Sequence, residues 1–80
     1  MAEIQVKLFA TLARYRPGAQ HGQPFALPLV EGQDLRAAVA KLGLPDEAVR
    51  HVFVNGRRVA LDYVPRPGDE VAIFPPLAGG

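Results

Sequence analysis

Hydrophobic residues recur at every second position in several short segments of the chain. In residues 3–9, Ile4, Val6 and Leu8 alternate with more polar neighbours, and this period of two predicts a half-buried strand. Residues 25–29 and 70–74 alternate in the same way. Pro28 has no backbone N–H for a strand ladder, so the segment 25–29 is predicted to lie at a sheet edge.

Helical spacing replaces this alternation after Asp34. The residues Leu35, Ala38, Val39 and Leu42 recur at intervals of three and four, which predicts one buried stripe on a helix of about two turns. Asp34 is a suitable N-cap because its carboxylate accepts from the first free backbone N–H groups. Gly43 and then Pro45 end the helix.

Two turn signals follow the helix. Asn55-Gly56 tolerates the positive φ angles of a type I′ turn, and it joins two apolar segments, so residues 51–59 are predicted to form a hairpin. In Arg66-Pro67-Gly68-Asp69, proline at the second position and glycine at the third fit a type II turn before residues 70–74. Residues 10–24 contain two prolines and two glycines and are predicted to be a loop, with one helical turn around residues 12–15.

The predicted order of elements is β, β, α, β, β, β. One main helix must then cover one face of a mixed sheet of about five strands, which is an α+β architecture. A crossover through the helix can place the last strand beside the first and parallel to it, as in the β-grasp or ubiquitin-like fold. The chain has 80 residues, so residues 1–80 are predicted to form a single domain.

The amino-acid composition limits where in the cell the protein is expected and which kinds of partner it is expected to bind. Hydrophobic residues make up 49% and charged residues 21%, which is typical of a globular protein, and no apolar run reaches the roughly 18 residues of a membrane-spanning helix. The first residues lack the pattern of a secretory signal. There is no cysteine, and the net charge is +1. A cytoplasmic protein with no attachment to membranes or nucleic acid is therefore expected.

The residues with catalytic side chains form no known constellation. His21 and His51 are far apart and lack a metal-binding spacing, so no metal is expected, and neither a hydrolase signature nor a phosphate-binding loop is present. Asp34 is interpreted as a cap only. Asp69 and Glu70 are interpreted as serving turn chemistry and solubility.

Three phenylalanines form a candidate partner-binding surface. Phe9 and Phe74 lie on the parity opposite to the apolar positions of their strands, and neighbouring strands would place their rings side by side on the open sheet face. Phe53 joins them if Val52 and Val54 point inward. Such a cluster either binds a partner or is a pair covered by the long loop. Arg57 and Arg58 are either a solvated hairpin arm or a contact to an acidic partner.

The last residues form an unusual end. Pro75 and Pro76 stiffen the exit from the sheet, and together with Leu77 they are candidate partner-binding residues. A slim Gly79-Gly80 thread without Cβ atoms ends the sequence. Residues 75–80 are predicted to be a flexible tail that can enter a narrow cleft of another enzyme and present its carboxylate. The competing interpretation is an unused, frayed end.

Two segments resemble a known family. "VKLFATLARYRPG" and "VNGRRV…PGDEVAIFPPLAGG", and within them "LFATLA" and "FPPLAGG", resemble the small subunit of molybdopterin synthase, the MoaD type, which is related to the thiamin-pathway carrier ThiS. The resemblance implies a β-grasp sulfur carrier. It also implies that an adenylating enzyme of the MoeB/ThiF type would use ATP to activate the carboxylate of Gly80, and that a sulfur-donor enzyme would convert it to a thiocarboxylate (1-thioglycine).

The same resemblance implies the next step. The carrier docks on a large subunit of the MoaE type, where its sulfur passes to a pterin precursor in molybdenum cofactor biosynthesis. The chain is then a sulfur-donor subunit of an enzyme complex, and it binds no cofactor directly. Three alternatives remain open: delivery of sulfur to thiamin, cysteine or tRNA; a ubiquitin-like modifier conjugated through Gly80; and a domain remnant without a transfer role. The segment "FPPLAGG" favours a small subunit of molybdopterin synthase over a thiamin-pathway carrier.

Overall fold

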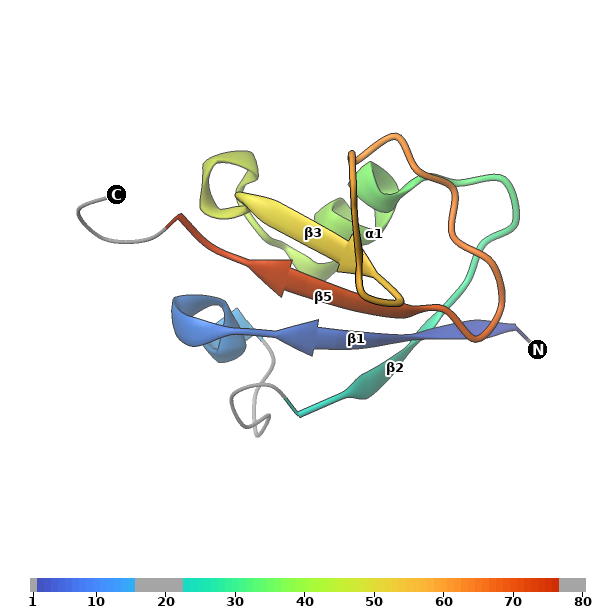
Figure 1. Ribbon diagram of the computed structural model, residues 1–80, viewed down its shortest axis with the longest axis horizontal. Coiled ribbons are helices and arrows are strands. Elements are labelled where there is room, and N and C mark those ends of the chain that lie inside the picture. Colours follow the sequence, from blue (N-terminus) through green and yellow to red (C-terminus); the bar gives the residue numbers. More distant parts are fainter. Residues whose placement is uncertain (1, 16–22, 77–80) are drawn as a thin grey trace.

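The strands assemble into one mixed sheet that is packed against a helix (Figure 1). The computed structural model describes residues 2–15 and 23–76. The strands are β1 (Glu3–Leu8), β2 (Phe25–Pro28), β3 (His51–Val54), β4 (Arg57–Val59) and β5 (Glu70–Phe74). The helix is α1 (Leu35–Leu42), and short 3₁₀ segments span Ala10–Tyr15 and Asp46–Ala48.

The strand order is β2-β1-β5-β3-β4. The central pair, β1 and β5, is parallel with Val6 opposite Val71, and the other neighbours are antiparallel. The expected β-grasp architecture is thereby confirmed. β2 lies at the edge, as Pro28 predicted, because a proline there leaves no ladder hydrogen bond unmade.

The helix α1 has the predicted caps. An Asp34 Oδ1 atom accepts a hydrogen bond from the Ala37 N–H at 3.2 Å, and Gly43 ends the helix with φ of 78°. Leu35 and Val39 are buried, whereas Ala38 and Leu42 are partly buried against the same cluster. The helix therefore buries one stripe against the sheet and leaves its other side exposed.

The core lies between α1 and the helix-facing side of the sheet. Leu12, from the 3₁₀ segment, and Leu44, just after α1, close its ends. Its sheet positions are the alternating apolar residues of the sequence: Ile4, Val6, Leu8, Phe25, Leu27, Val52, Val54, Val71 and Ile73. In each long strand, the alternate residues that face the helix belong to this core. The residues between them must therefore face away from the helix.

Both predicted turns are present. Asn55 and Gly56 have φ angles of 52° and 84°, as a type I′ hairpin turn requires. Gly68 has φ of 84°, and the Asp69 N–H donates to the Arg66 carbonyl at 3.1 Å, which fits the type II turn. These turns place the end of the hairpin next to the start of β5.

Candidate functional site

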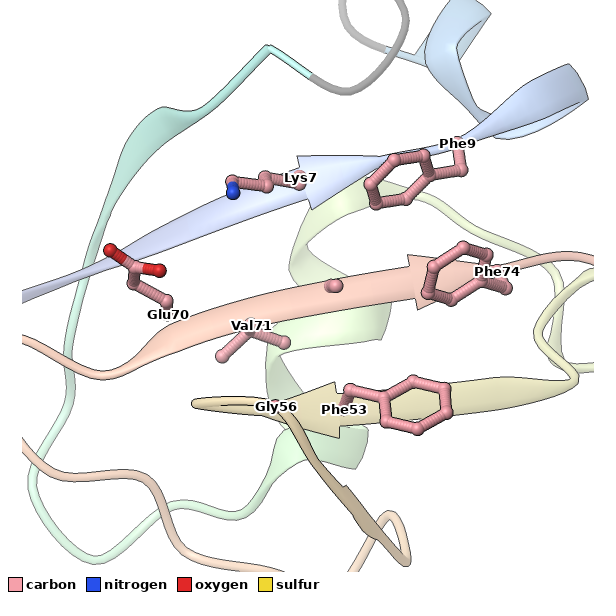
Figure 2. Close-up of a pocket in the computed structure, with 8 residues that line it drawn as sticks. Lys7, Phe9, Phe53, Gly56, Glu70, Val71 and Phe74 are labelled. Atoms are coloured by element: carbon pink, nitrogen blue, oxygen red, sulfur yellow. The ribbon is translucent and has the colours of Figure 1, made fainter.

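Three aromatic rings meet on the open face of the sheet, and we call Phe9, Phe53 and Phe74 the aromatic patch. The rings of Phe9 and Phe74 are stacked, with centroids 4.4 Å apart and planes 4° apart. Phe53 meets Phe74 edge to face, with centroids 5.6 Å apart. Figure 2 shows the three rings at one end of the sheet, with α1 behind it.

Strand register explains why these rings meet. The Phe9 N–H donates to the Ile73 carbonyl at 3.2 Å, so Phe9 lies beside the end of β5. Leu8 and Ile73 are each only 2% exposed on the helix side, which sends Phe9 and Phe74 to the other face. Val52 and Val54 are buried too, so Phe53 faces outward as expected. The predicted placement of the three rings is confirmed.

A shallow groove of about 410 Å³ runs along this face beside the aromatic patch. Ala72 lies in its lining, and strand pairing places Ala72 between Lys7 on β1 and Phe53 on β3. A small side chain among large ones leaves a depression at the middle of the sheet. Lys7 and Glu70 line the part of the groove away from the rings (Figure 2). The groove thus has an aromatic end and a charged end.

The two hairpin arginines occupy different registers. Both residues are exposed. Arg58 is paired with Phe53, whereas Arg57 is paired with Val54, whose side chain belongs to the core face. Because paired residues share a face, Arg58 rather than Arg57 belongs to the side of the aromatic patch. From the sequence alone Arg57 and Arg58 were interpreted alike, and only the strand register distinguishes their faces.

The exit from β5 differs from the prediction at one residue. Pro75 is buried and Pro76 is exposed. The Arg50 N–H donates to the Phe74 carbonyl at 2.9 Å, which ties the last residue of β5 to the segment before β3. Pro75 was predicted to belong to the tail, but it is packed into the fold and offers little surface to a partner. Leu77, Gly79 and Gly80 lie outside the described residues.

A polar cluster at the other end of β5 was missed by sequence reasoning. Asp69 is only 8% exposed, which contradicts a role in solubility. Its carboxylate accepts hydrogen bonds from the Asn55 side chain at 3.0 Å, the Tyr63 hydroxyl at 3.1 Å and the Arg66 N–H at 2.9 Å. The turn function predicted for Asp69 is confirmed by the last bond. The two remaining bonds to Asp69 have one signal in the sequence: Asn55 lies in one tight turn and Asp69 lies in another, and side chains of both types often hydrogen-bond within turns.

The hydrogen bonds shift the acidity of this cluster. Burial by itself raises the pKa of Asp69, but the bonds from Arg66, Asn55 and Tyr63 outweigh it and lower the pKa below its usual 3.8. Burial and the bond to Asp69 raise the pKa of Tyr63. The carboxylate is therefore an ionised hub that joins the hairpin turn to the start of β5.

Other chemistry is sparse in the part of the chain that the structure describes. No group of three His, Asp or Glu side chains lies together there in a way that could hold a metal ion. The Nδ1 atom of His51 is buried and has no hydrogen-bond partner among residues 2–15 and 23–76. His21 lies outside those ranges. None of the helices in these ranges has the length and apolar character that crossing a bilayer demands.

These features define a ubiquitin-like β-grasp protein whose open sheet face carries an aromatic groove next to the end of its last strand. The sequence matches the family described as Mut7-C ubiquitin over residues 1–78, so the chain belongs to that family. The resemblance to MoaD/ThiS-type ubiquitin-fold sulfur carriers is confirmed by this match together with the structural comparisons.

Solved structures of three chains share the fold closely. Two are of the small archaeal modifier protein SAMP1 from Haloferax volcanii; both are 26% identical, with TM-scores of 0.67 and 0.72. The alignments cover 98% and 96% of this chain and 99% and 100% of those chains. The third is a putative molybdopterin converting factor, subunit 1, from Pyrococcus furiosus, at 26% identity and a TM-score of 0.67, covering 96% of this chain and all of that one. No curated protein matches the chain in sequence.

Proposed function

We propose that this protein is a sulfur carrier whose Gly80 carboxylate is adenylated by a partner and converted to a thiocarboxylate. A terminal carboxylate is an anion at neutral pH and a poor electrophile, so it requires activation before it can accept sulfur. The activating enzyme uses ATP to form an acyl-adenylate at Gly80 and releases pyrophosphate. Sulfur from a separate donor then attacks the acyl carbon, and AMP leaves. The chain itself contributes the reacting atom and the docking surface, and it works in the cytoplasm.

The position of the aromatic patch is the observation that carries this proposal. Phe74 is the last residue of β5, and the chain leaves the sheet directly after it. A partner that covers Phe9, Phe53 and Phe74 therefore also fixes the starting point of the segment that leads to Gly80. Holding a reacting group in place through remote contacts is an effective way to speed a transfer step. The likeness to a molybdopterin converting factor supports the same chemistry.

We further propose that the acceptor is a pterin precursor bound to a MoaE-type large subunit, so that the chain acts as the small subunit of molybdopterin synthase. The Gly79-Gly80 end would enter the site of the large subunit, and the aromatic groove would hold the sheet against its surface. Support comes from "FPPLAGG" in the sequence and from the Pyrococcus furiosus relative.

A test of the chemical step uses intact mass. The full chain is incubated with a MoeB/ThiF-type enzyme, ATP and a sulfur donor, and we expect a gain equal to the difference between one sulfur atom and one oxygen atom. Deletion of Gly80 should abolish this gain and leave the thermal midpoint unchanged. If wild-type protein shows no mass change while the same enzyme thiolates its own cognate carrier, Gly80 is not the acceptor.

A second function has its own support. Two of the similar structures are of a protein named as a modifier, so the activated Gly80 could instead form amide bonds with lysines of other proteins. Activation begins in the same way in both cases. Incubation with activating enzyme in a lysate separates them, because conjugation gives a ladder of larger species that contain the chain, whereas sulfur transfer gives none.

The docking face has a separate test. Ala72 forms part of the groove between Lys7 and Phe53, so a large side chain there fills the groove while retaining strand propensity. Ala72→Phe should lower partner affinity by roughly tenfold or more, which corresponds to about 1.4 kcal/mol. Ala26→Phe is the matched control, because Ala26 is an exposed residue of the edge strand β2 and does not line the groove. Equal binding by both variants would exclude the groove as the docking face.

A further inference from the structure

The turn that joins β3 to β4 contains a chemically fragile pair of residues. Asn55 is the single asparagine of the chain, and glycine follows it. Asparagine is one of the thermolabile residues, and a following glycine favours its deamidation because glycine has no Cβ to hinder attack by its own nitrogen. Both residues are exposed, so water reaches the turn.

Deamidation at this turn would need no enzyme. The Gly56 backbone nitrogen, after loss of its proton, attacks the side-chain carbonyl carbon of Asn55, and the side-chain nitrogen leaves as ammonia. The product is a five-membered succinimide. Water then opens either of its two carbonyls and gives aspartate or isoaspartate. The net change is one ammonia lost and one water gained, so the reaction requires neither an oxidant nor a cofactor.

The fold holds the Asn55 amide at both of its ends. The Nδ2 group donates to Asp69 Oδ1 at 3.0 Å, and the Oδ1 atom accepts from the Glu70 N–H at 2.9 Å. The Asn55 backbone N–H also donates to the Glu70 carbonyl at 2.9 Å. The amide is thus turned toward the start of β5. A rotation of the amide toward the Gly56 nitrogen would break these two side-chain bonds, so both bonds oppose the reaction.

The partner of this amide is itself held in place. Asp69 is buried, and its second oxygen accepts from the Tyr63 hydroxyl and the Arg66 N–H. Rotation of Asn55 would therefore leave a buried charged oxygen with one bond fewer, which is costly. We infer that Asn55 is a deamidation site whose reaction the Asp69 cluster suppresses, and that its conversion to aspartate or isoaspartate releases the Asn55-Gly56 turn from the start of β5 and loosens the hairpin.

Charge and backbone geometry both explain why deamidation would weaken the contact between the turn and β5. After deamidation, a carboxylate replaces the amide group that donates to Asp69, so two negative groups face each other where a hydrogen bond had been. Isoaspartate also lengthens the backbone by one carbon within a two-residue turn that sets the β3–β4 register. The hairpin carries Phe53, so the damage reaches the aromatic patch. This inference does not depend on the proposed sulfur chemistry.

The experiment follows deamidation by intact mass and locates isoaspartate by peptide mapping. Asn55 is the single asparagine, but deamidation of Gln5, Gln20, Gln23 or Gln33 would give the same mass change, so the peptide map assigns the change to Asn55. Under mildly alkaline conditions we expect the folded chain to react roughly tenfold more slowly than the same chain in denaturing urea, because the reactive rotation requires broken hydrogen bonds. Equal rates in the two states would overturn the protective role.

Two variants assign the protection to Asp69. Asp69→Ala, measured where circular dichroism shows it folded, should react about fivefold or more faster than wild type, and a rate within twofold of wild type would contradict the inference. Tyr63→Phe is the control, since it removes a bond to Asp69 but leaves both Asn55 side-chain bonds, and it should react within about twofold of wild type. If Asp69→Ala is unfolded, Asn55→Asp is used instead to test whether the turn is released from β5. In this variant, backbone amide hydrogen exchange in residues 51–59 should be faster than in wild type. Unchanged exchange would refute the release.

Discussion

At the amino end of β5, Asp69 is buried and accepts three hydrogen bonds, whereas at the carboxyl end Phe74 lies half-exposed against two other rings. Directional bonds fix the first end to the hairpin and to the turn at Arg66. At the second end the backbone is paired, but the Phe74 side chain makes only non-directional ring contacts and stays partly exposed. One strand thus joins an end anchored by side-chain hydrogen bonds to an end whose aromatic surface we propose as the recognition end.

The largest effect is expected from breaking the anchored end. Asp69→Ala removes the acceptor for Asn55, Tyr63 and the Arg66 N–H, so the free energy of unfolding should fall by about 3 kcal/mol. Urea denaturation followed by circular dichroism measures it. Asp62→Ala is the control, because Asp62 is exposed, and it should change stability by about 0.5 kcal/mol or less. Similar losses in the two variants would show that Asp69 contributes only as a surface charge.

Breaking the recognition end should affect binding more than folding. Phe74→Ala removes the ring that contacts both Phe9 and Phe53, and it should weaken binding to the proposed partner, a MoaE-type large subunit, by roughly 30-fold, which corresponds to about 2 kcal/mol. Isothermal calorimetry with variants confirmed as folded provides the measurement. Wild-type affinity in this variant would mean that the aromatic patch is covered surface and not an interface.

Acid should weaken the anchored end selectively. The pKa of Asp69 is lowered on folding, so its ionised form stabilises the fold above its usual pKa of 3.8, and this contribution is lost as pH falls through the lower folded-state value. The stability difference between wild type and Asp69→Asn should therefore shrink between about pH 5 and about pH 2. Urea midpoints of both proteins across this range measure it. A difference that stays constant would show that the carboxylate charge does not contribute.

The smallest effect is expected at the rim. Arg57→Ala should change partner affinity by less than about fivefold and mainly alter its salt dependence. Since Arg58 is paired with Phe53 and Arg57 is not, Arg58→Ala should cost more than Arg57→Ala in the same titration. If Arg57→Ala is more damaging than Phe74→Ala, charge rather than apolar contact leads the interface.

Much of the fold, including the strands, the helix caps and the turns, could be predicted from short-range sequence patterns. Alternation placed Leu8 and Ile73 inside and therefore Phe9 and Phe74 outside, and the caps and turns at Asp34, Gly43 and Asn55-Gly56 follow from backbone chemistry. Each of these depends on neighbours within a few residues. The parallel pairing of first and last strands was accessible because one helix allows few crossover arrangements.

The features that the sequence did not predict depend on contacts between residues far apart in the chain. Asp69 looks like a polar turn residue, and only the approach of Asn55, 14 residues away, and Tyr63, 6 residues away, turns it into a buried hub. Pro75 was assigned to a flexible tail because two consecutive prolines were expected to direct the chain away from the sheet, yet tertiary packing buries Pro75. The difference between Arg57 and Arg58 likewise depends on the β3–β4 register rather than on residue type.

The parallel contact between β1 and β5 also governs the order in which the protein can fold. Val6 is paired with Val71, so the central strand pair closes a loop that contains every other element of the sheet and α1. Such long-range pairing slows folding, because the entropy of loop closure is lost before the contact forms. On a ribosome, the apolar side of β1, with Ile4, Val6 and Leu8, must remain without its central neighbour until residues 70–74 have emerged. A nascent chain halted before β5 would expose this strand to aggregation.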